Sequence, residues 1–323
     1  MGFGEVGTDR SGGSSPDHEP PSLSVIVPVY NGEATVRALY AEIAAALGHV
    51  RHEVVFVCDG GPGAAWEELE ALKDAYPAAV TIVRLSRNYG QHNAIICGFS
   101  YARGRHFVTM DEDLQHDAAD IPAMLATLER DRLHLVYGIA RETRHSVFRR
   151  VTSSLLRGLL RVGLPELHPD YSAFRVIRAD IARETIPMRN AYTFLDGYLA
   201  WLTQRVGSCE VSHRERYAGQ SAYSVAALVE HSVNIFFTFS KLPARLLSLA
   251  SVTILTVSTA YATYVVARKL IYDDLATGYP SLVAIIGFGI GFIMLALGII
   301  GEYLYRVNLK TTKRPNYNVE EVL

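Results

Sequence analysis

The sequence predicts an α/β domain with a mostly parallel sheet, followed by two membrane-spanning helices. From residue 23 to residue 137, short β-rich apolar runs alternate with helical stretches, which is the pattern of repeated strand–helix units. Near the C-terminus, two long runs contain no charged residue. The 323 residues are 49% apolar and only 20% charged, whereas globular chains are about 25% charged. This composition agrees with a globular domain joined to a membrane anchor.

The N-terminal domain, residues 22–223, is expected to alternate strands and helices. The expected strands are residues 23–30, 53–58, 80–85, 105–110 and 133–137. The expected helices are residues 33–47, 66–76, 93–102 and 121–130. In sheets of this kind, ligands bind beyond the carboxyl ends of the strands, near a switch in strand order. Polar residues at three strand ends are therefore the candidates for a binding site.

Two of these strand ends are glycine-containing segments. Residues 28–33 read PVYNGE, and residues 58–63 read CDGGPG. Glycines let the backbone approach a ligand closely, and the carboxylate of Asp59 can accept hydrogen bonds from a base or a ribose. Plain turns are the alternative for both segments, because Asp-Gly is a common turn dipeptide.

The third strand end carries alternating carboxylates, Asp111-Glu112-Asp113, followed by Leu114 and Gln115. Alternating carboxylates at a strand end can converge on one hard divalent cation. Mg²⁺ or Mn²⁺ held by a carboxylate or two and by phosphate oxygens is the usual arrangement for a diphosphate. A solvated acidic loop is the alternative, and the preceding apolar strand weakens it.

A basic amphipathic stretch follows at residues 141–161, where six arginines face the single acid Glu142. Valine, phenylalanine and leucine residues are interleaved with the arginines. A helix of this composition lies at a membrane surface or binds phosphate. A solvated basic face is the alternative.

The two uncharged runs, residues 246–267 and 281–301, are each long enough to cross a bilayer, which takes about 20 apolar residues. Buried helices of a globular domain are the alternative. Basic residues flank the outer ends of both runs, which places those ends and the N-terminal domain in the cytosol. The remaining expected segments are a disordered tail at 1–21, interfacial helices at 224–245, the membrane region at 246–304 and a cytoplasmic tail at 305–323.

Charge and cysteine content exclude several classes of protein. The formal net charge of −2 gives no case for a nucleic-acid binder. Three cysteines, Cys58, Cys97 and Cys209, are too few and too far apart for a disulfide framework or a zinc knuckle.

The polar segments taken together, in their order along the chain, resemble a known family. They are VPVYNGE (27–33), VCDGG (57–61), RNYGQHNAIICGF (87–99), ARG (102–104), MDEDLQHD (110–117), DYSAFR (170–175), ERYAGQSAYS (215–224), FSKLPAR (239–245), GIIGEYLYR (298–306) and KRPNY (313–317). This set resembles the family 2 glycosyltransferases with a GT-A fold, a Rossmann-like α/β fold. More narrowly, it is similar to the polyprenyl-phosphate glycosyltransferases, which include dolichyl-phosphate mannose synthase and bacterial enzymes that make undecaprenyl-phosphate sugars.

The resemblance implies a role for each matching residue. The nucleotide-sugar residues would be Pro28, Tyr30, Asn31, Glu33, Asp59, Asp111 and Glu112. The residues that hold Mg²⁺ or Mn²⁺ would be Asp111, Asp113 and Gln115. The acceptor-phosphate residues would be Arg141, Arg149, Arg150, Ser153, Arg175, Arg216 and Ser221. The catalytic residues would be Asp113 and Asp170.

The implied reaction moves one sugar from a nucleotide diphosphate sugar to a polyprenyl phosphate, with inversion, at the cytoplasmic face of a bacterial inner membrane. UDP is favoured over GDP, the sugar is open, and a homo-oligomer is left open. Because a phosphate nucleophile is already anionic, a strong base is not required. Asp170 is expected to orient the acceptor or the sugar.

Two other functions are weighed against this one. Transfer to a lipid hydroxyl, as in diacylglycerol or ceramide, would need a base, and Asp170 would be the candidate. A non-catalytic membrane scaffold is the third hypothesis, which the presence of Asp111 and Asp113 disfavours. One departure concerns the donor: the usual Asp-Asp-Gly-Ser is here Cys58-Asp59-Gly60-Gly61.

Overall fold

A computed structural model describes most of the globular part of the chain and one long C-terminal helix. The described residues are 21–61, 63–140, 166–188, 192–214, 279–311 and 315–323, together with short pieces between 233 and 271. Residues 1–20 of the predicted tail at 1–21 and the basic stretch at 141–161 lie outside them, as do most residues of the predicted interfacial helices at 224–245.

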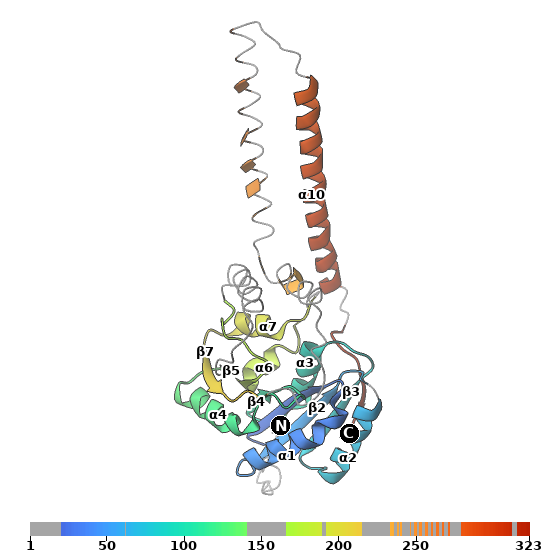
Figure 1. Ribbon diagram of the computed structural model, residues 1–323, viewed down its shortest axis with the longest axis vertical. Helices are drawn as coiled ribbons and strands as arrows, with labels where there is room; N and C mark the ends of the chain where they lie inside the picture. Colours follow the sequence, from blue (N-terminus) through green and yellow to red (C-terminus); the bar gives the residue numbers. More distant parts are fainter. Residues whose placement is uncertain are drawn as a thin grey trace, which may run out of the picture.

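One eight-stranded sheet forms the centre of the globular part, in the order β7-β5-β6-β4-β1-β2-β3-β8 (Figure 1). The strands are β1 (Leu23–Val29), β2 (His52–Cys58), β3 (Val80–Leu85), β4 (His106–Thr109), β5 (Leu135–Ala140), β6 (Arg175–Arg178), β7 (Val206–Val211) and β8 (Val319–Val322). The strands β4, β1, β2 and β3 are parallel neighbours, as the sequence predicts. Strand β6 lies between β4 and β5 and pairs antiparallel with both. The fifth expected strand, β5, is therefore not a direct neighbour of the four parallel strands.

Helices cover both faces of the sheet. The helices are α1 (Val36–Leu47), α2 (Gly63–Ala75), α3 (Gln91–Tyr101), α4 (Ile121–Arg130), α6 (Ala179–Glu184), α7 (Leu195–Leu202) and α10 (Tyr279–Thr311), with 3-10 turns η2 (Gly32–Ala34) and η3 (Ala118–Asp120). Apolar residues of α1, α2 and α4 form one core cluster, and those of α3, α6 and α7 form another. Strand β1 serves both clusters because its side chains alternate, with Val25 and Val27 in the first and Ile26 in the second.

The C-terminal residues belong to the sheet. Strand β8 pairs antiparallel with β3, and the backbones of Ile82 and Leu323 exchange two hydrogen bonds of 3.0 Å. The C-terminus therefore lies beside β3 and α2, on the globular part (Figure 1). The expected cytoplasmic tail at 305–323 did not include this strand, because its four residues, VEEV, are too short to show a periodicity.

The long helix α10 contains the second predicted membrane run, and the first run lies mostly outside the described residues. Of the helices that the structure describes, none combines the length and the apolar character that crossing a membrane requires. Both predicted spans stay predictions.

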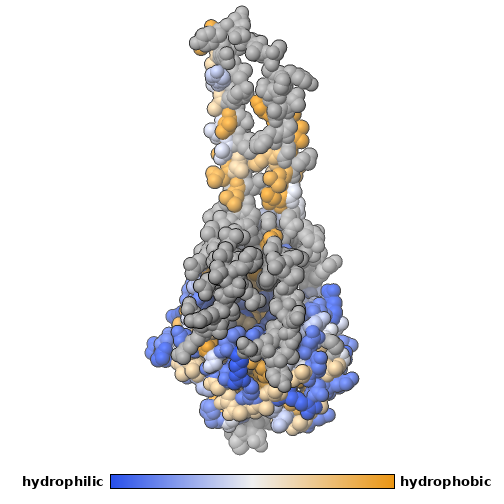
Figure 2. Space-filling model, in the orientation of Figure 1, coloured by the Kyte–Doolittle hydropathy of each residue, from blue (hydrophilic) through white to orange (hydrophobic). Residues whose placement is uncertain are grey.

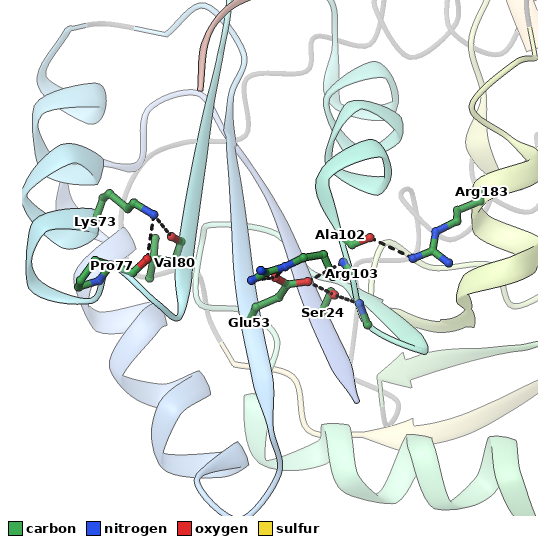
Figure 3. Close-up of polar contacts among 9 residues, drawn as sticks. Ser24, Glu53, Lys73, Pro77, Val80, Ala102, Arg103 and Arg183 are labelled. Carbon is green, nitrogen blue, oxygen red and sulfur yellow. Dashed lines mark hydrogen bonds and ion pairs between the residues drawn. The ribbon is translucent and has the colours of Figure 1, made fainter. Parts of the chain in front are cut away.

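A buried polar cluster joins the amino ends of β1 and β2 to the chain that follows α3 (Figure 3). The Glu53 carboxylate is 1% exposed and accepts hydrogen bonds from Ser24 Oγ at 2.7 Å and from the Arg103 backbone N–H at 2.6 Å. The Arg103 guanidinium adds a charged partner at 2.7 Å. Because this cluster lies at the amino end of the strands, opposite to the candidate site, its role is structural.

Candidate active site

The candidate site lies at the carboxyl edge of the parallel strands. The chain runs from β1 to β2 and β3 on one side and then places β4 on the other side of β1. The gap between the ends of β1 and β4 is therefore a switch in strand order, where ligands of α/β sheets bind. Residues 30–33 follow β1 and residues 111–115 follow β4, so both predicted segments flank this switch.

Residues of the first segment differ in their access to a ligand. Tyr30 is 45% exposed, and Asn31 and Glu33 are also exposed. Pro28 instead is buried within β1, opposite Val57 of β2. The structure thus brings Tyr30, Asn31 and Glu33 to the surface of this edge, while Pro28 shapes the strand.

Asp59 at the end of β2 holds the loop before α3. Its carboxylate is 4% exposed and accepts hydrogen bonds from the N–H groups of Tyr89 at 2.7 Å and Gly90 at 2.8 Å. Burial raises the pKa of Asp59, and the two amide hydrogen bonds act against that rise. A Cβ atom at Gly61 would lie 1.9 Å from the Tyr30 carbonyl oxygen, so the position that usually carries serine cannot do so here without a shift.

The carboxylates after β4 have different surroundings. Asp111 Oδ1 accepts a hydrogen bond of 2.5 Å from the side-chain amide of Gln91, at the start of α3. Asp113 Oδ1 accepts the N–H of Gln115 at 3.2 Å, across a turn in which Leu114 takes a left-handed φ of 61°. Asp111, Asp113 and Gln115 are half-buried. Gln91 is a site residue that the sequence did not single out by itself.

Glu112, between the two aspartates, accepts hydrogen bonds from the backbone of residues 30–33, here called the β1 segment. Its Oε2 accepts the N–H of Tyr30 and its Oε1 accepts the N–H of Asn31, both at 3.1 Å. Burial raises the pKa of Glu112, and these two hydrogen bonds act against that rise.

The segment that carries Asp170 approaches the same edge. Strand β6 pairs antiparallel with β4, with Arg175 opposite Thr109, so residues just before β6 lie beside the end of β4. Thr109 Oγ1 donates a hydrogen bond of 2.7 Å to the Ala173 carbonyl. Asp170 is exposed, and its N–H donates to His168 Nδ1 at 3.3 Å.

The structure places Arg175, which the resemblance assigns to the acceptor phosphate, inside the core. Its side chain is 1% exposed, and Nη1 pairs with Asp196 Oδ1 on α7 at 2.5 Å. Tyr137 Oη donates to the same carboxylate oxygen at 2.9 Å. The charge of Arg175 is therefore neutralised inside the core, by Asp196. The signal in the sequence was a single acid in the otherwise apolar segment LDGYLAWL of α7.

Hydrogen bonds and ion pairs hold the chain that leaves β7 beside residues 111–115, here called the acidic turn. The N–H of Arg214 donates to the Gln115 carbonyl at 2.9 Å, and its guanidinium pairs with Glu42 at 2.8 Å and Asp117 at 2.6 Å. His116 stacks on Phe174 with ring centroids 5.0 Å apart. Burial lowers the pKa of His116 to about 4. The other predicted acceptor residues lie outside the described residues: Arg141, Arg149, Arg150, Ser153, Arg216 and Ser221.

The acidic turn suits a metal that a diphosphate helps to hold. Within the described ranges, no group of three or more His, Cys, Asp or Glu converges to form a metal cage. Mg²⁺ and Mn²⁺ need no such cage when one or two carboxylates act together with phosphate oxygens. Asp111 and Asp113 supply hard oxygen ligands of that kind, so the residues present fit such an ion.

Comparisons with known proteins agree with this geometry. The model of the family described as Glycosyl transferase family 2 matches residues 24–186. The undecaprenyl-phosphate 4-deoxy-4-formamido-L-arabinose transferase of Shewanella sediminis is 28% identical over 306 residues, covering 93% of this chain and 92% of its own. The protein of the same name from Proteus mirabilis is 29% identical over 307 residues, covering 93% of this chain and 94% of its own.

A solved structure has a similar fold. The UDP complex of glucosyl-3-phosphoglycerate synthase from Mycobacterium tuberculosis superposes with a TM-score of 0.51 at 18% identity. The match covers 67% of this chain and 78% of that one.

Proposed function

Because the chain belongs to glycosyl transferase family 2, we propose that it moves one sugar from a nucleotide diphosphate sugar to a polyprenyl phosphate. One observation carries the proposal: Tyr30, Asp59 and Asp111 follow the neighbouring strands β1, β2 and β4, at and beside the switch in strand order. The names of relatives that match over 93% of the chain support undecaprenyl phosphate as the acceptor.

The donor would lie across the two segments that flank the switch. The exposed ring of Tyr30 offers a face for the base, and the half-buried carboxylates of Asp111 and Asp113 would face the diphosphate. A divalent cation, when bound to these carboxylates, offsets the charge of the leaving nucleotide diphosphate. A solved structure of glucosyl-3-phosphoglycerate synthase contains Mn²⁺ and UDP-glucose, which supports a metal and a uridine nucleotide here.

The transfer itself does not require a strong general base. A phosphate oxygen of the acceptor forms the new bond to the anomeric carbon, and the bond from that carbon to the donor diphosphate breaks. Both the nucleophile and the leaving group are anions at neutral pH, so no proton has to be removed first. We assign the exposed Asp170, three residues before the Ala173 carbonyl that Thr109 at the end of β4 contacts, to orienting the acceptor or the sugar. Attack opposite to the leaving group would invert the anomeric centre.

We further propose that the enzyme works at the cytoplasmic face of a bacterial inner membrane. Figure 2 shows hydrophobic residues gathered along the stalk that contains α10, and hydrophilic residues over the globular part. Large apolar side chains of α10 are strongly exposed, among them Leu282, Ile286, Ile293 and Leu297. Because β8 follows α10 and pairs with β3, residues before and after the predicted membrane region belong to one sheet. This supports an even number of membrane crossings.

Product analysis tests the proposal. Purified enzyme in detergent is incubated with Mn²⁺, a panel of UDP- and GDP-sugars, and either undecaprenyl phosphate or diacylglycerol, and the lipids are analysed by mass spectrometry. We expect a glycosylated lipid phosphate from one donor. A glycosylated diacylglycerol, or no product from any donor, would contradict the proposed acceptor.

Substitution of Asp113 tests the metal assignment. Asp113→Ala is expected to abolish metal-dependent turnover, because it removes a hard oxygen ligand next to the diphosphate. Asp74→Asn, an exposed carboxylate on α2, serves as the matched control and is expected to keep full activity. Near-normal turnover of Asp113→Ala would show that the metal lies elsewhere.

A further inference from the structure

The middle residue of the acidic turn makes contacts that differ from those of its neighbours. Asp111 receives the Gln91 amide, and the Asp113 carboxylate accepts the N–H of Gln115 within its own turn. The Glu112 carboxylate bonds instead to the N–H groups of Tyr30 and Asn31, which are 82 and 81 residues away in the chain. Each carboxylate oxygen accepts a hydrogen bond from one N–H group, so the Glu112 side chain links the two segments.

The β1 segment is shaped to receive this carboxylate. A Cβ atom added at Gly32 would lie 2.4 Å from Glu112 Oε2, closer than real Cβ contacts come. It would also lie 2.9 Å from Cγ1 atoms of Val29 and Val36. Glycine at position 32 thus leaves the space in which the Glu112 carboxylate lies. The fit is two-sided. The acidic turn supplies the acceptor carboxylate, and the β1 segment supplies two N–H donors and, at Gly32, the space that this carboxylate fills.

The two segments that Glu112 joins have different tasks in the proposed reaction. Tyr30 and Asn31 lie where the base of the donor would be held, and Asp111 and Asp113 lie where its diphosphate would be held. Without a link, the β1 segment could move independently of the acidic turn. Hydrogen bonds from backbone N–H groups to a carboxylate are charge-assisted and about twice as strong as neutral ones.

We propose that Glu112 is a positioning residue that holds the β1 segment against the acidic turn. The base and the diphosphate of the donor would then meet one rigid unit. This inference rests on the proposed function only in taking a nucleotide as the ligand. Glu112 itself need not touch the donor. The resemblance implies that Glu112 binds the nucleotide sugar, and its two contacts with backbone N–H groups suggest instead that it acts through Tyr30 and Asn31.

The first test measures nucleotide binding without any acceptor. UDP and GDP are titrated by calorimetry into wild-type enzyme, Glu112→Ala and Glu112→Gln, each with and without Mn²⁺. The nucleotide that wild-type enzyme binds is expected to bind Glu112→Ala at least about tenfold more weakly, equal to about 1.4 kcal/mol. Glu112→Gln keeps the shape and one acceptor oxygen, so a smaller loss is expected. Glu67→Ala, an exposed glutamate on α2, is the matched control and should bind as wild type does.

The second test follows the contact in the absence of any ligand. Hydrogen exchange at the N–H groups of Tyr30 and Asn31 is expected to accelerate in Glu112→Ala and to stay unchanged in Glu67→Ala. A melting temperature close to that of wild type separates this local effect from general unfolding. Unchanged exchange at both N–H groups, or nucleotide affinity within about twofold of wild type, would overturn the proposal.

A double-mutant cycle with Gly32→Ala completes the design. If Gly32 makes room for the Glu112 carboxylate, Gly32→Ala should weaken nucleotide binding strongly in wild type and less in the Glu112→Ala background. Equal losses in both backgrounds would contradict the two-sided fit. Because these readouts need no lipid, they can succeed while product analysis fails, and the reverse also holds.

Discussion

Removal of the Asp196 carboxylate is expected to destabilise the globular part by about 3–5 kcal/mol, the usual cost of leaving a buried ion without its partner. The magnitude follows from the geometry of the pair. The side chains of Arg175 and Asp196 are 1% and 3% exposed, and their charged atoms lie 2.5 Å apart. In Asp196→Ala the guanidinium would keep its charge in the core, and Tyr137 would lose the acceptor of its hydroxyl group.

Urea unfolding in detergent, followed by tryptophan fluorescence, measures this loss. Asp180→Ala is the matched control: its carboxylate pairs with Arg178 at 2.7 Å but is 59% exposed, so a loss of about 0–1 kcal/mol is expected. An apolar replacement of the whole cluster, Arg175→Met with Asp196→Leu and Tyr137→Phe, is expected to recover the stability, because no charge remains buried. The reasoning is refuted if Asp196→Ala loses no more than Asp180→Ala.

Three further predictions concern buried groups. Cys209 is expected to react with Ellman's reagent in the native enzyme at pH 8, while Cys58 and Cys97 react only after unfolding, since both are buried and burial raises the pKa of Cys97 to about 12; labelling of all three thiols in the native state would count against it. Stability should fall as the pH drops from about 6.5 to about 4, by up to about 1.4 kcal/mol per pH unit. The reason is that burial lowers the pKa of His116, so in this range only the unfolded chain binds the proton at this side chain. The urea midpoints of wild type and His116→Phe should therefore depend on pH with different slopes. Glu53→Ala should cost about 1–3 kcal/mol, because it leaves buried N–H and O–H donors without an acceptor; a urea midpoint equal to that of wild type would exclude such a cost.

The strand–helix order of the first 130 residues could be predicted because it is a local property. The expected strand at 80–85 and helix at 121–130 coincide with β3 and α4, since apolar periodicity and flanking turn residues are present within each segment. The acidic turn was recognisable for the same reason, as carboxylates directly after an apolar strand. Its use in binding a metal stays a prediction.

Only the tertiary structure decided the partners of charged residues and of the strand at the sheet edge, because these partners come from distant parts of the chain. The ion pair of Arg175 could not be predicted because its counter-charge, Asp196, lies on a later helix. Strand β8 was missed because it is stabilised by β3, more than 230 residues earlier in the chain. The direction of Glu112 likewise depends on N–H groups at the end of β1. Local patterns determine which elements form, because helix and strand periodicity is written within a few residues. Long-range hydrogen bonds and ion pairs form only once the sheet has brought the strand ends together, so only the folded chain shows which polar group is free to meet a ligand.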